Sequence, residues 1–389
     1  MALTGHADGP PSVTPASVYA LLEATVSALS SMTAQIGERV EMDAGQILTR
    51  RAATAGTQRR GRVSVGGATE LLRTSDGWCA VTLSRPDDVT SLPAVLGRPT
   101  LGDPWAAVEA AAAEWSAIAL ADRAQLLGVP AAALPRTVSS AVPWRAARLA
   151  PAADSVSLRG RRVVDLSSMW AGPLCARILA DAGAHVVKVE STARPDGARR
   201  GDPQFFDWLH RGHEFRTLDF SDARDRRTLH NLLDQADIVI EASRPRALAA
   251  LGLAPEDLRH RRGKIWVSLT GYGRSDPMRV AFGDDAAVAG GLVGWQNSEP
   301  VFCADAIADP LTGVCAALAA VCAVRAGGGL LLDVSMRDTA AAFAAAPTID
   351  HGPHPVRPDA MGWAVECPSY GLSQQVLPPR VSAGRGRTC

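Results

Sequence analysis

The sequence predicts an α/β protein with a doubly wound, mostly parallel sheet. The first observation is the run RRVVDLSSMWAGPLCARILADAGAHVVKVES (161–191), in which two β-branched strand-like runs flank a helical pattern. The second is that strand-like and helical runs keep alternating after it. The strand-like runs cover 237–242, 264–273 and 330–336, and the helical runs cover 225–236 and 255–260. Such an alternation favours a Rossmann-like sheet with helical crossovers.

A smaller α+β unit is expected before this sheet. VYALLEATVSALSSM (18–32) has apolar residues at helical spacing, and ELLRTSDGWCAVTL (70–83) holds two extended runs around Asp76-Gly77, a strong hairpin pattern. Two further helical stretches follow, at 103–120 and 121–129. The Pro- and Ser-containing stretch 129–144 is typical of a linker.

These patterns divide the chain into four parts. We expect an N-terminal helical segment (1–60), a small α+β domain with its linker (61–150), a Rossmann-like domain (151–345) and a loose Pro/Gly-rich tail (346–389). With 389 residues, 47% of them hydrophobic, the chain is long enough to bury a sizeable core.

Charge and cysteine usage narrow the partners and the compartment. Forty basic and forty acidic residues balance, so no overall field attracts nucleic acid or a membrane surface. The clusters RGRR (159–162) and ARDRR (223–227) are candidate anion sites, although solvated surface is the favoured interpretation. Seven scattered cysteines fit reduced thiols, and we find neither a signal-peptide core nor an apolar run of membrane-spanning length, so we expect a cytoplasmic protein.

The sequence favours neither a metal site nor a tightly bound cofactor. The HxxH pairs His210/His213 and His351/His354 lack nearby cysteines or carboxylates, and HRGH is typical of a loop. The loop SSMWAGPL (167–174) has one glycine where a dinucleotide fingerprint needs three. An NAD-dependent enzyme is therefore disfavoured.

The segment from Asp165 to Ser191 resembles the family III CoA-transferases (CaiB/BaiF-like), the group that contains formyl-CoA transferase, the carnitine-CoA transferases and α-methylacyl-CoA racemase. Further matches follow in the family's order: TLDF (217–220), ADIVIEASRP (236–245), LGL (251–253), SLTGYG (268–273) and DVSMRD (333–338). In most members the small domain follows the nucleotide-fold half. Here it precedes that half, so the chain looks circularly rearranged.

The resemblance directs attention to the stretch CADAIADPLTGVCAAL (303–318). Asp309 stands before Pro310 and an apolar run, which predicts a helix N-cap, and it matches the family's catalytic aspartate. We expect the helix dipole to hold its carboxylate ionised. Asp305 has neither a cap setting nor a family match, so we expect its loss to leave activity largely intact.

The resemblance also implies ligand contacts. Met169, Trp170 and Ala171 match the positions that contact CoA, although Trp170 fits structural packing equally well. Other positions depart from the family pattern: His213 replaces a lysine, Ser191 a basic residue, and EAS with Ala242 replaces ENF. These departures weaken the match to a standard CoA phosphate site.

The implied activity is CoA transfer from an acyl-CoA to a carboxylic acid, through an aspartyl anhydride and an aspartyl-CoA thioester on Asp309. Two alternatives stay open. One is racemase-like proton transfer on a 2-methylacyl-CoA, although Asp284 stands where that branch has histidine. The other is a catalytically weakened subunit that binds acyl-CoA or a partner chain. The usual members form interlocked dimers, so the resemblance implies a homodimer or association with a related subunit.

Overall fold

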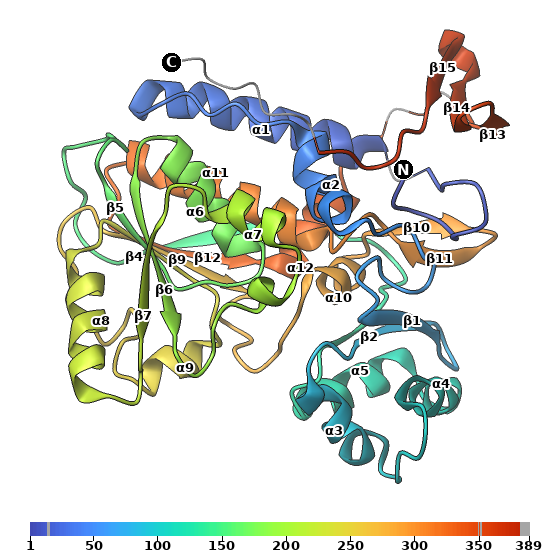
Figure 1. The fold of residues 1–389 in the computed structure, drawn as a ribbon, viewed down its shortest axis with the longest axis horizontal. Helices are drawn as coiled ribbons and strands as arrows, with labels where there is room; N and C mark the ends of the chain where they lie inside the picture. The colour runs from blue at the N-terminus through green and yellow to red at the C-terminus, as the bar shows by residue number, and fades with distance from the viewer. Residues whose placement is uncertain (14–15, 349, 351, 382–389) are drawn as a thin grey trace.

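The computed structural model describes residues 1–13, 16–348, 350 and 352–381, and its central feature is a seven-stranded mixed sheet (Figure 1). Six strands run parallel to one another, and the edge strand β4 runs antiparallel to β12. The strands lie in the order β4 (Trp144–Arg148), β12 (Leu330–Ser335), β9 (Ile265–Thr270), β8 (Ile238–Glu241), β5 (Arg162–Asp165), β6 (His185–Ser191) and β7 (Glu214–Leu218). The predicted α/β class is confirmed.

Successive residues of the central strands pack on opposite faces of this sheet. Val163 and Ile238 join one apolar core, while their neighbours Val164 and Val239 join another. Both faces are therefore buried, which explains why these strands are apolar along their length. The first face carries α1 (Ala16–Ile36), α6 (Ala171–Asp181), α11 (Ala308–Arg325) and α12 (Met336–Ala344), and the second carries α8 (Ala223–Gln235) and α9 (Pro245–Ala249).

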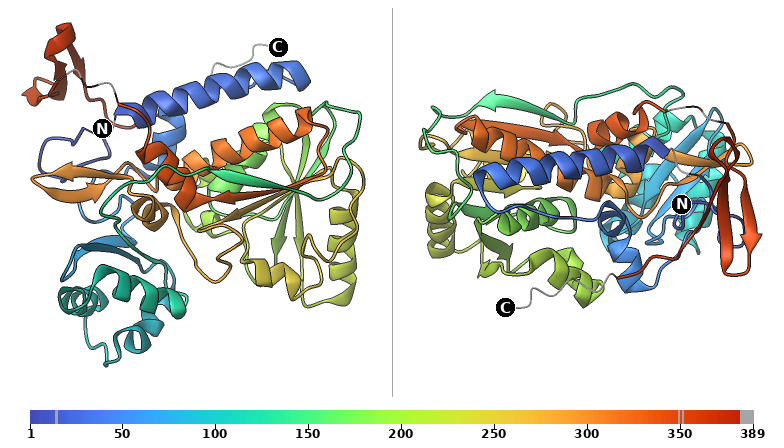
Figure 2. Two further views of the ribbon diagram at one scale, coloured as in Figure 1. Left: turned by 180° about the vertical axis from the view of Figure 1, so that it is seen from behind. Right: turned by 90° about the horizontal axis from the view of Figure 1, so that it is seen from above.

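Helix α11 lies at the centre of the first core, between the sheet and α1 (Figure 2). It packs closely on α6, because a β-carbon on Gly313 would lie 2.7 Å from the carbonyl oxygen of Ala171. Its 18 residues are apolar enough to cross a membrane, so the expectation that no run reaches that length was wrong. However, 78% of this window is buried inside the protein, as in the core helix of a globular fold.

The small unit forms a separate core of its own, below the sheet at the right in Figure 1. Asp76-Gly77 connects β1 to β2 as predicted, with Arg73 paired to Trp78 across the turn. Its elements are β1 (Thr69–Arg73), β2 (Trp78–Thr82), β3 (Ala131–Ala133), α3 (Pro86–Leu96), α4 (Pro104–Glu114) and α5 (Ala117–Leu126).

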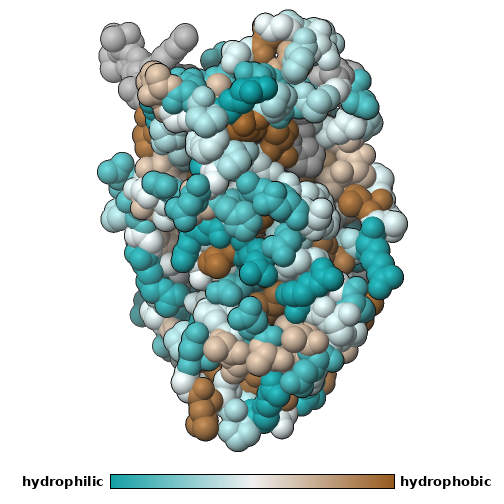
Figure 3. Space-filling view, turned by 90° about the vertical axis from the view of Figure 1, so that its right-hand side faces the viewer, coloured by the Kyte–Doolittle hydropathy of each residue, from teal (hydrophilic) through white to brown (hydrophobic). Residues whose placement is uncertain are grey.

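Further elements lie around these two parts. They are α2 (Ala44–Ala55), the short helix η1 (Gly197–Arg200), α7 (Pro203–His210), α10 (Gly283–Ala289), β10 (Val293–Gln296) and β11 (Glu299–Phe302). Of these, α10 and β11 contact the small unit. The face on the right of Figure 1 mixes hydrophilic side chains with small, separate apolar groups, as Figure 3 shows. That mixture is ordinary for a protein surface.

Three local expectations were wrong. Residues 255–260 form turns rather than a helix, because so short a segment has little to stabilise a helix. The expected linker contains β3 of the small sheet, and its last residue, Trp144, begins β4 of the large one. The expected loose tail instead contains β13 (Val356–Asp359), β14 (Gly362–Cys367), a turn of 3-10 helix (Pro368–Tyr370) and β15 (Leu372–Gln375), which pair as a small antiparallel sheet.

Candidate active site

A cleft of about 1290 Å³ opens between the large sheet and the small unit. One wall is formed by residues that follow the carboxyl ends of β5, β6 and β8, among them Met169, Asp196 and Arg244. The opposite wall comes from the small unit and includes Thr82 and Arg85. Strand order reverses at β5, and open α/β sheets bind ligands at this edge, beside such a reversal.

Asp309 lies half-buried at one end of this cleft. The N-cap prediction was wrong, because α11 begins at Ala308 and Asp309 is its second residue. The chain already winds into turns from Ala304, and Ile307 has helical dihedral angles (φ −57°, ψ −29°), so the helix starts earlier than the Asp-Pro pair suggests.

The electrostatic surroundings of Asp309 differ from those expected of a simple helix start. Burial, helped by the nearby carboxyls of Asp284 and Asp305 and opposed by Arg51 and the Gly283 backbone, raises the pKa of Asp309 to about 7. The helix dipole therefore does not keep the group fully ionised near neutral pH. Asp309 is poised to exchange a proton in the physiological range.

Arg51, from α2, is the cation of this end of the cleft. Its Nε donates to Asp305 Oδ2 at 2.8 Å, and its Nη2 pairs with the other oxygen of the same carboxylate. Its guanidinium also lies 5.1 Å from the ring centroid of Trp170. Asp305, expected to be idle, is 1% exposed and fixes this arginine beside Asp309.

The loop after β5 contains the three predicted ligand contacts, and the structure places them differently. Met169 lines the cleft and has a left-handed backbone (φ 72°), which is costly for a residue other than glycine. Trp170 and Ala171 are buried beneath the cleft, and Trp170 makes an edge contact with Phe205 at 5.1 Å. Their roles in ligand binding stay predictions, and packing describes the observed position of Trp170.

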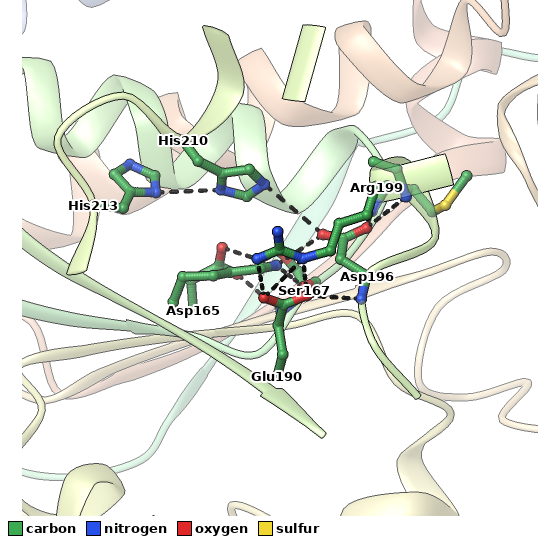
Figure 4. A network of polar contacts seen from close by, with 10 residues as sticks. Asp165, Ser167, Glu190, Asp196, Arg199, His210 and His213 are labelled. Carbon is green, nitrogen blue, oxygen red and sulfur yellow. Dashed lines mark hydrogen bonds and ion pairs between the residues drawn. The ribbon is translucent and has the colours of Figure 1, made fainter. Parts of the chain in front are cut away.

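A buried polar network holds this loop from below (Figure 4). Asp196 Oδ1 accepts the backbone N–H of Met169 at 2.9 Å, and its Oδ2 lies 3.1 Å from Nζ of Lys188. Lys188, fully buried, also pairs with Asp165 at 3.5 Å. Glu190 accepts the backbone N–H of Asp196, so the strand β6 and the following turn are tied together.

Arginines outnumber the aspartates that line the cleft. Seven arginines line it, of which Arg51, Arg85 and Arg199 pair with carboxylates. Within the described part of the chain, the other four guanidiniums, of Arg194, Arg200, Arg244 and Arg246, have no hydrogen-bond or ion-pair partner. Burial, then the charges of Arg246, Arg85 and Arg194, lower the pKa of Arg244, which shows that these cations crowd one another.

Sequence reasoning missed these arginines, although the runs RPDGARR and SRPR follow β6 and β8 directly. The two arginine clusters that it did select, RGRR and ARDRR, do not line the cleft. The departures from the family pattern also lie outside it: Ser191 ends β6, Ala242 is exposed after β8, and His213 is half-buried beside His210.

The structure offers no metal site among the residues it describes. The rings of His210 and His213 meet through their Nδ1 atoms at 3.4 Å, and burial lowers the pKa values to about 3 and about 4, so both are neutral. His351 of the second HxxH pair lies outside the described residues.

Sequence comparisons identify the family of this chain. A model of CoA-transferase family III matches residues 158–370, and the chain belongs to this family. An acyl-CoA transferase of Fusarium pseudograminearum is 33% identical over 208 residues, which cover 47% of this chain and 46% of the relative. A succinate–glutarate CoA-transferase of Agrobacterium fabrum is 30% identical over 226 residues, covering 51% of this chain and 56% of the relative. The chain spans about half the length of the curated relatives it matches.

Solved structures with partial similarity include a hypothetical protein, Rv3272, from Mycobacterium tuberculosis. It is 31% identical, with a TM-score of 0.45, and the match covers 48% of this chain and 56% of that chain. A CaiB/BaiF family protein from Brucella suis is 25% identical, with a TM-score of 0.47, and the match covers 55% of this chain and 66% of that chain.

Proposed function

We propose that this chain is a CoA-transferase that moves CoA from an acyl-CoA thioester to a carboxylic acid, with Asp309 as the nucleophile. One observation carries the proposal: a half-buried carboxyl of raised pKa shares a single cleft with four arginines whose guanidiniums have no partner among the described residues. The carboxyl supplies a nucleophile, and the arginines supply partners for the phosphates of CoA. Relatives named as CoA-transferases support this choice.

The first half of the reaction removes CoA from the donor. An oxygen of ionised Asp309 attacks the thioester carbonyl, the C–S bond breaks, and a mixed anhydride and CoA thiolate result. The thiolate then attacks the aspartyl carbonyl of the anhydride, which releases the donor acid and leaves an aspartyl-CoA thioester. The acceptor carboxylate attacks this thioester and releases the thiolate, which takes the acceptor acyl group and restores Asp309.

The four unpaired arginines hold the phosphates in this proposal, in place of the basic residues that the family pattern has near Ser191 and His213. Met169 lines the same cleft. We also propose that the large sheet is a doubly wound, Rossmann-like sheet. Its parallel strand order β7-β6-β5-β8-β9-β12, with helices on both faces, supports this description.

Racemase-like proton transfer is the second candidate, and the position of Asp284 in the same cleft favours it. Two acids beside a bound acyl-CoA could exchange an α-proton. Against it, no histidine lines the described part of the cleft. In heavy water, transfer without deuterium uptake at the α-carbon supports the first candidate, whereas rapid uptake without transfer supports the second.

We also propose that the protein is cytoplasmic. We propose further that it forms a dimer, either from two copies of this chain or with a related subunit. Free thiols at Cys79, Cys175, Cys303, Cys315 and Cys322 support the location. Light scattering of the purified protein measures the oligomeric state.

The decisive experiment is intact-mass spectrometry after incubation with a panel of acyl-CoAs. We expect wild-type protein to gain the mass of CoA less one water, with no acyl group, and peptide mapping to locate the CoA on Asp309. Asp309→Asn should gain nothing. If the label forms on another residue, or if the Asn variant transfers CoA at the wild-type rate, the mechanism is wrong.

A further inference from the structure

Two carboxyl groups, those of Asp284 and Asp309, face the same end of the cleft. The cation beside them, Arg51, already forms a bidentate ion pair with another acid, Asp305. Three acids thus share one guanidinium. If all three were ionised, two negative charges would remain uncompensated in a largely buried site, at a high desolvation cost. The geometry therefore favours a proton held between Asp284 and Asp309.

Asp284 is held by hydrogen bonds from the Ala306 backbone and from the Ser64 side chain, and both lower its pKa. Its Oδ1 accepts the backbone N–H of Ala306 at 3.0 Å, and the residue is 9% exposed. The charged groups that act on it are Arg51 from α2, Asp305 and Asp309 at the start of α11, and its neighbour Asp285. Asp285 is engaged elsewhere, since its Oδ1 accepts from the Phe282 backbone and the Thr82 hydroxyl.

Resting on the CoA transfer proposed above, we infer that Asp284 is a second catalytic residue, which in its neutral form donates a hydrogen bond to the oxyanion of the thioester. As ionised Asp309 attacks, the carbonyl π electrons move onto the carbonyl oxygen, where the Asp284 O–H stabilises them. The intermediate collapses when the C–S bond breaks and its electron pair leaves with sulfur. Asp284 keeps its proton throughout, as a neutral carboxylic acid in an oxyanion hole does.

The titration of the pair agrees with this role. Burial raises the pKa of Asp284 to about 6 and that of Asp309 to about 7, and the Asp284 carboxyl contributes to the rise at Asp309. Because the groups are coupled, they release two protons as a pair. Without substrate, the proton shared by the two carboxyls resides mainly on Asp309, which has the higher pKa. When the carbonyl oxygen of the thioester accepts a hydrogen bond from Asp284, the proton is stabilised on Asp284 instead.

The test is the pH dependence of kcat for wild type, Asp284→Asn and Asp284→Ala. The active state of wild type holds one proton in the pair, so its profile should be bell-shaped. Asn keeps a donor but cannot ionise, so the alkaline fall should disappear. The acid limb should move to lower pH because the repulsion of Asp309 is removed. Ala should show the same profile as Asn, with kcat lower by about 100-fold to 1,000-fold.

Three results overturn the inference. One is an alkaline fall that persists in Asp284→Asn, and another is Asp284→Ala activity within a few-fold of Asp284→Asn. In both cases wild type still transfers CoA, and the proposed function stands. If wild type transfers no CoA, the proposed function fails and takes the inference with it. Circular dichroism and thermal melting of each variant show whether it folds.

Discussion

Gly283 and Asp309 approach each other so closely that no larger residue fits at position 283. A β-carbon there would overlap with Oδ2 of Asp309 and with the carbonyl oxygen of Ala306. Gly283 begins α10 and Asp309 stands in the first turn of α11. The start of one helix thus fixes where the carboxyl of the next can lie.

We therefore expect Gly283→Ala to displace the Asp309 carboxyl and to lower transfer by at least about 100-fold, since a misplacement of about 1 Å can cost that much. The protein should also be less stable by about 1–3 kcal/mol, from the overlap. Steady-state kinetics and denaturant unfolding measure the two effects. Gly77→Ala is the control, because a β-carbon there meets nothing within 4 Å. Equal activity in both variants would contradict the close approach.

The carboxyl of Asp309 should reduce stability at neutral and alkaline pH. Its folded-state pKa, about 7, lies above the ordinary value of 3.8, so the folded protein binds this proton more tightly than the unfolded chain. Stability from this group is full below pH 3.8 and falls as pH rises to about 7. Asp309→Asn should therefore raise the melting temperature, by about 2 °C at pH 8, with a smaller gain at pH 5.

Differential scanning calorimetry at both pH values checks this expectation. Asp87→Asn, a change to an exposed acid at the rim of the cleft, serves as the control and should leave the melting temperature nearly unchanged. A loss of stability in Asp309→Asn at pH 8 would mean that the carboxylate is structurally required.

Removing Arg51 should move the pH profile in a known direction. Arg51 lowers the pKa of both Asp309 and Asp284, so Arg51→Met should raise both values. The acid limb of transfer should then shift to higher pH, and activity at pH 7 should fall. Asp305→Asn should have the opposite effect, because it frees Arg51 and removes one repelling charge. An unshifted acid limb in Arg51→Met would exclude this arrangement.

The sequence could predict what depends on neighbours in the chain. The strands around Val163 and Ile238 and the hairpin at Asp76-Gly77 follow from local patterns, and the resemblance led to Asp309. The pair between Arg51 and Asp305 joins residues 254 positions apart, so no local pattern contains it. The prediction that Asp309 is the N-cap was wrong because the Asp-Pro pair alone does not set the start of α11. The turns before the helix, including left-handed Ala306 (φ 42°), decide where it begins.

The buried ion network below Met169 predicts a large stability effect. Lys188→Met would leave Asp165 and Asp196 buried without their cation, which typically costs about 3–5 kcal/mol. Lys264→Met is a matched control. Lys264 is also buried, but within the described chain it forms no ion pair and donates to the Leu233 carbonyl. We expect it to cost about 1–3 kcal/mol. Urea unfolding measures both, and equal costs would show that the carboxylates gain little from Lys188.

The unpaired arginines should act on CoA through its phosphates. Arg244→Gln removes a half-buried guanidinium that has no partner among the described residues, so the folded protein should lose little stability. The KM for acyl-CoA should rise by about tenfold, the equivalent of roughly 1.4 kcal/mol, because a charge-assisted bond to phosphate is lost. The matched control is Arg227→Gln, an exposed change on α8 outside the cleft. Titration calorimetry with CoA and with 3′-dephospho-CoA, at low and high salt, shows whether the lost contact is to the 3′-phosphate or to the other phosphates of CoA. If Arg244→Gln binds both ligands as tightly as wild type does, the arginines of this cleft do not hold CoA.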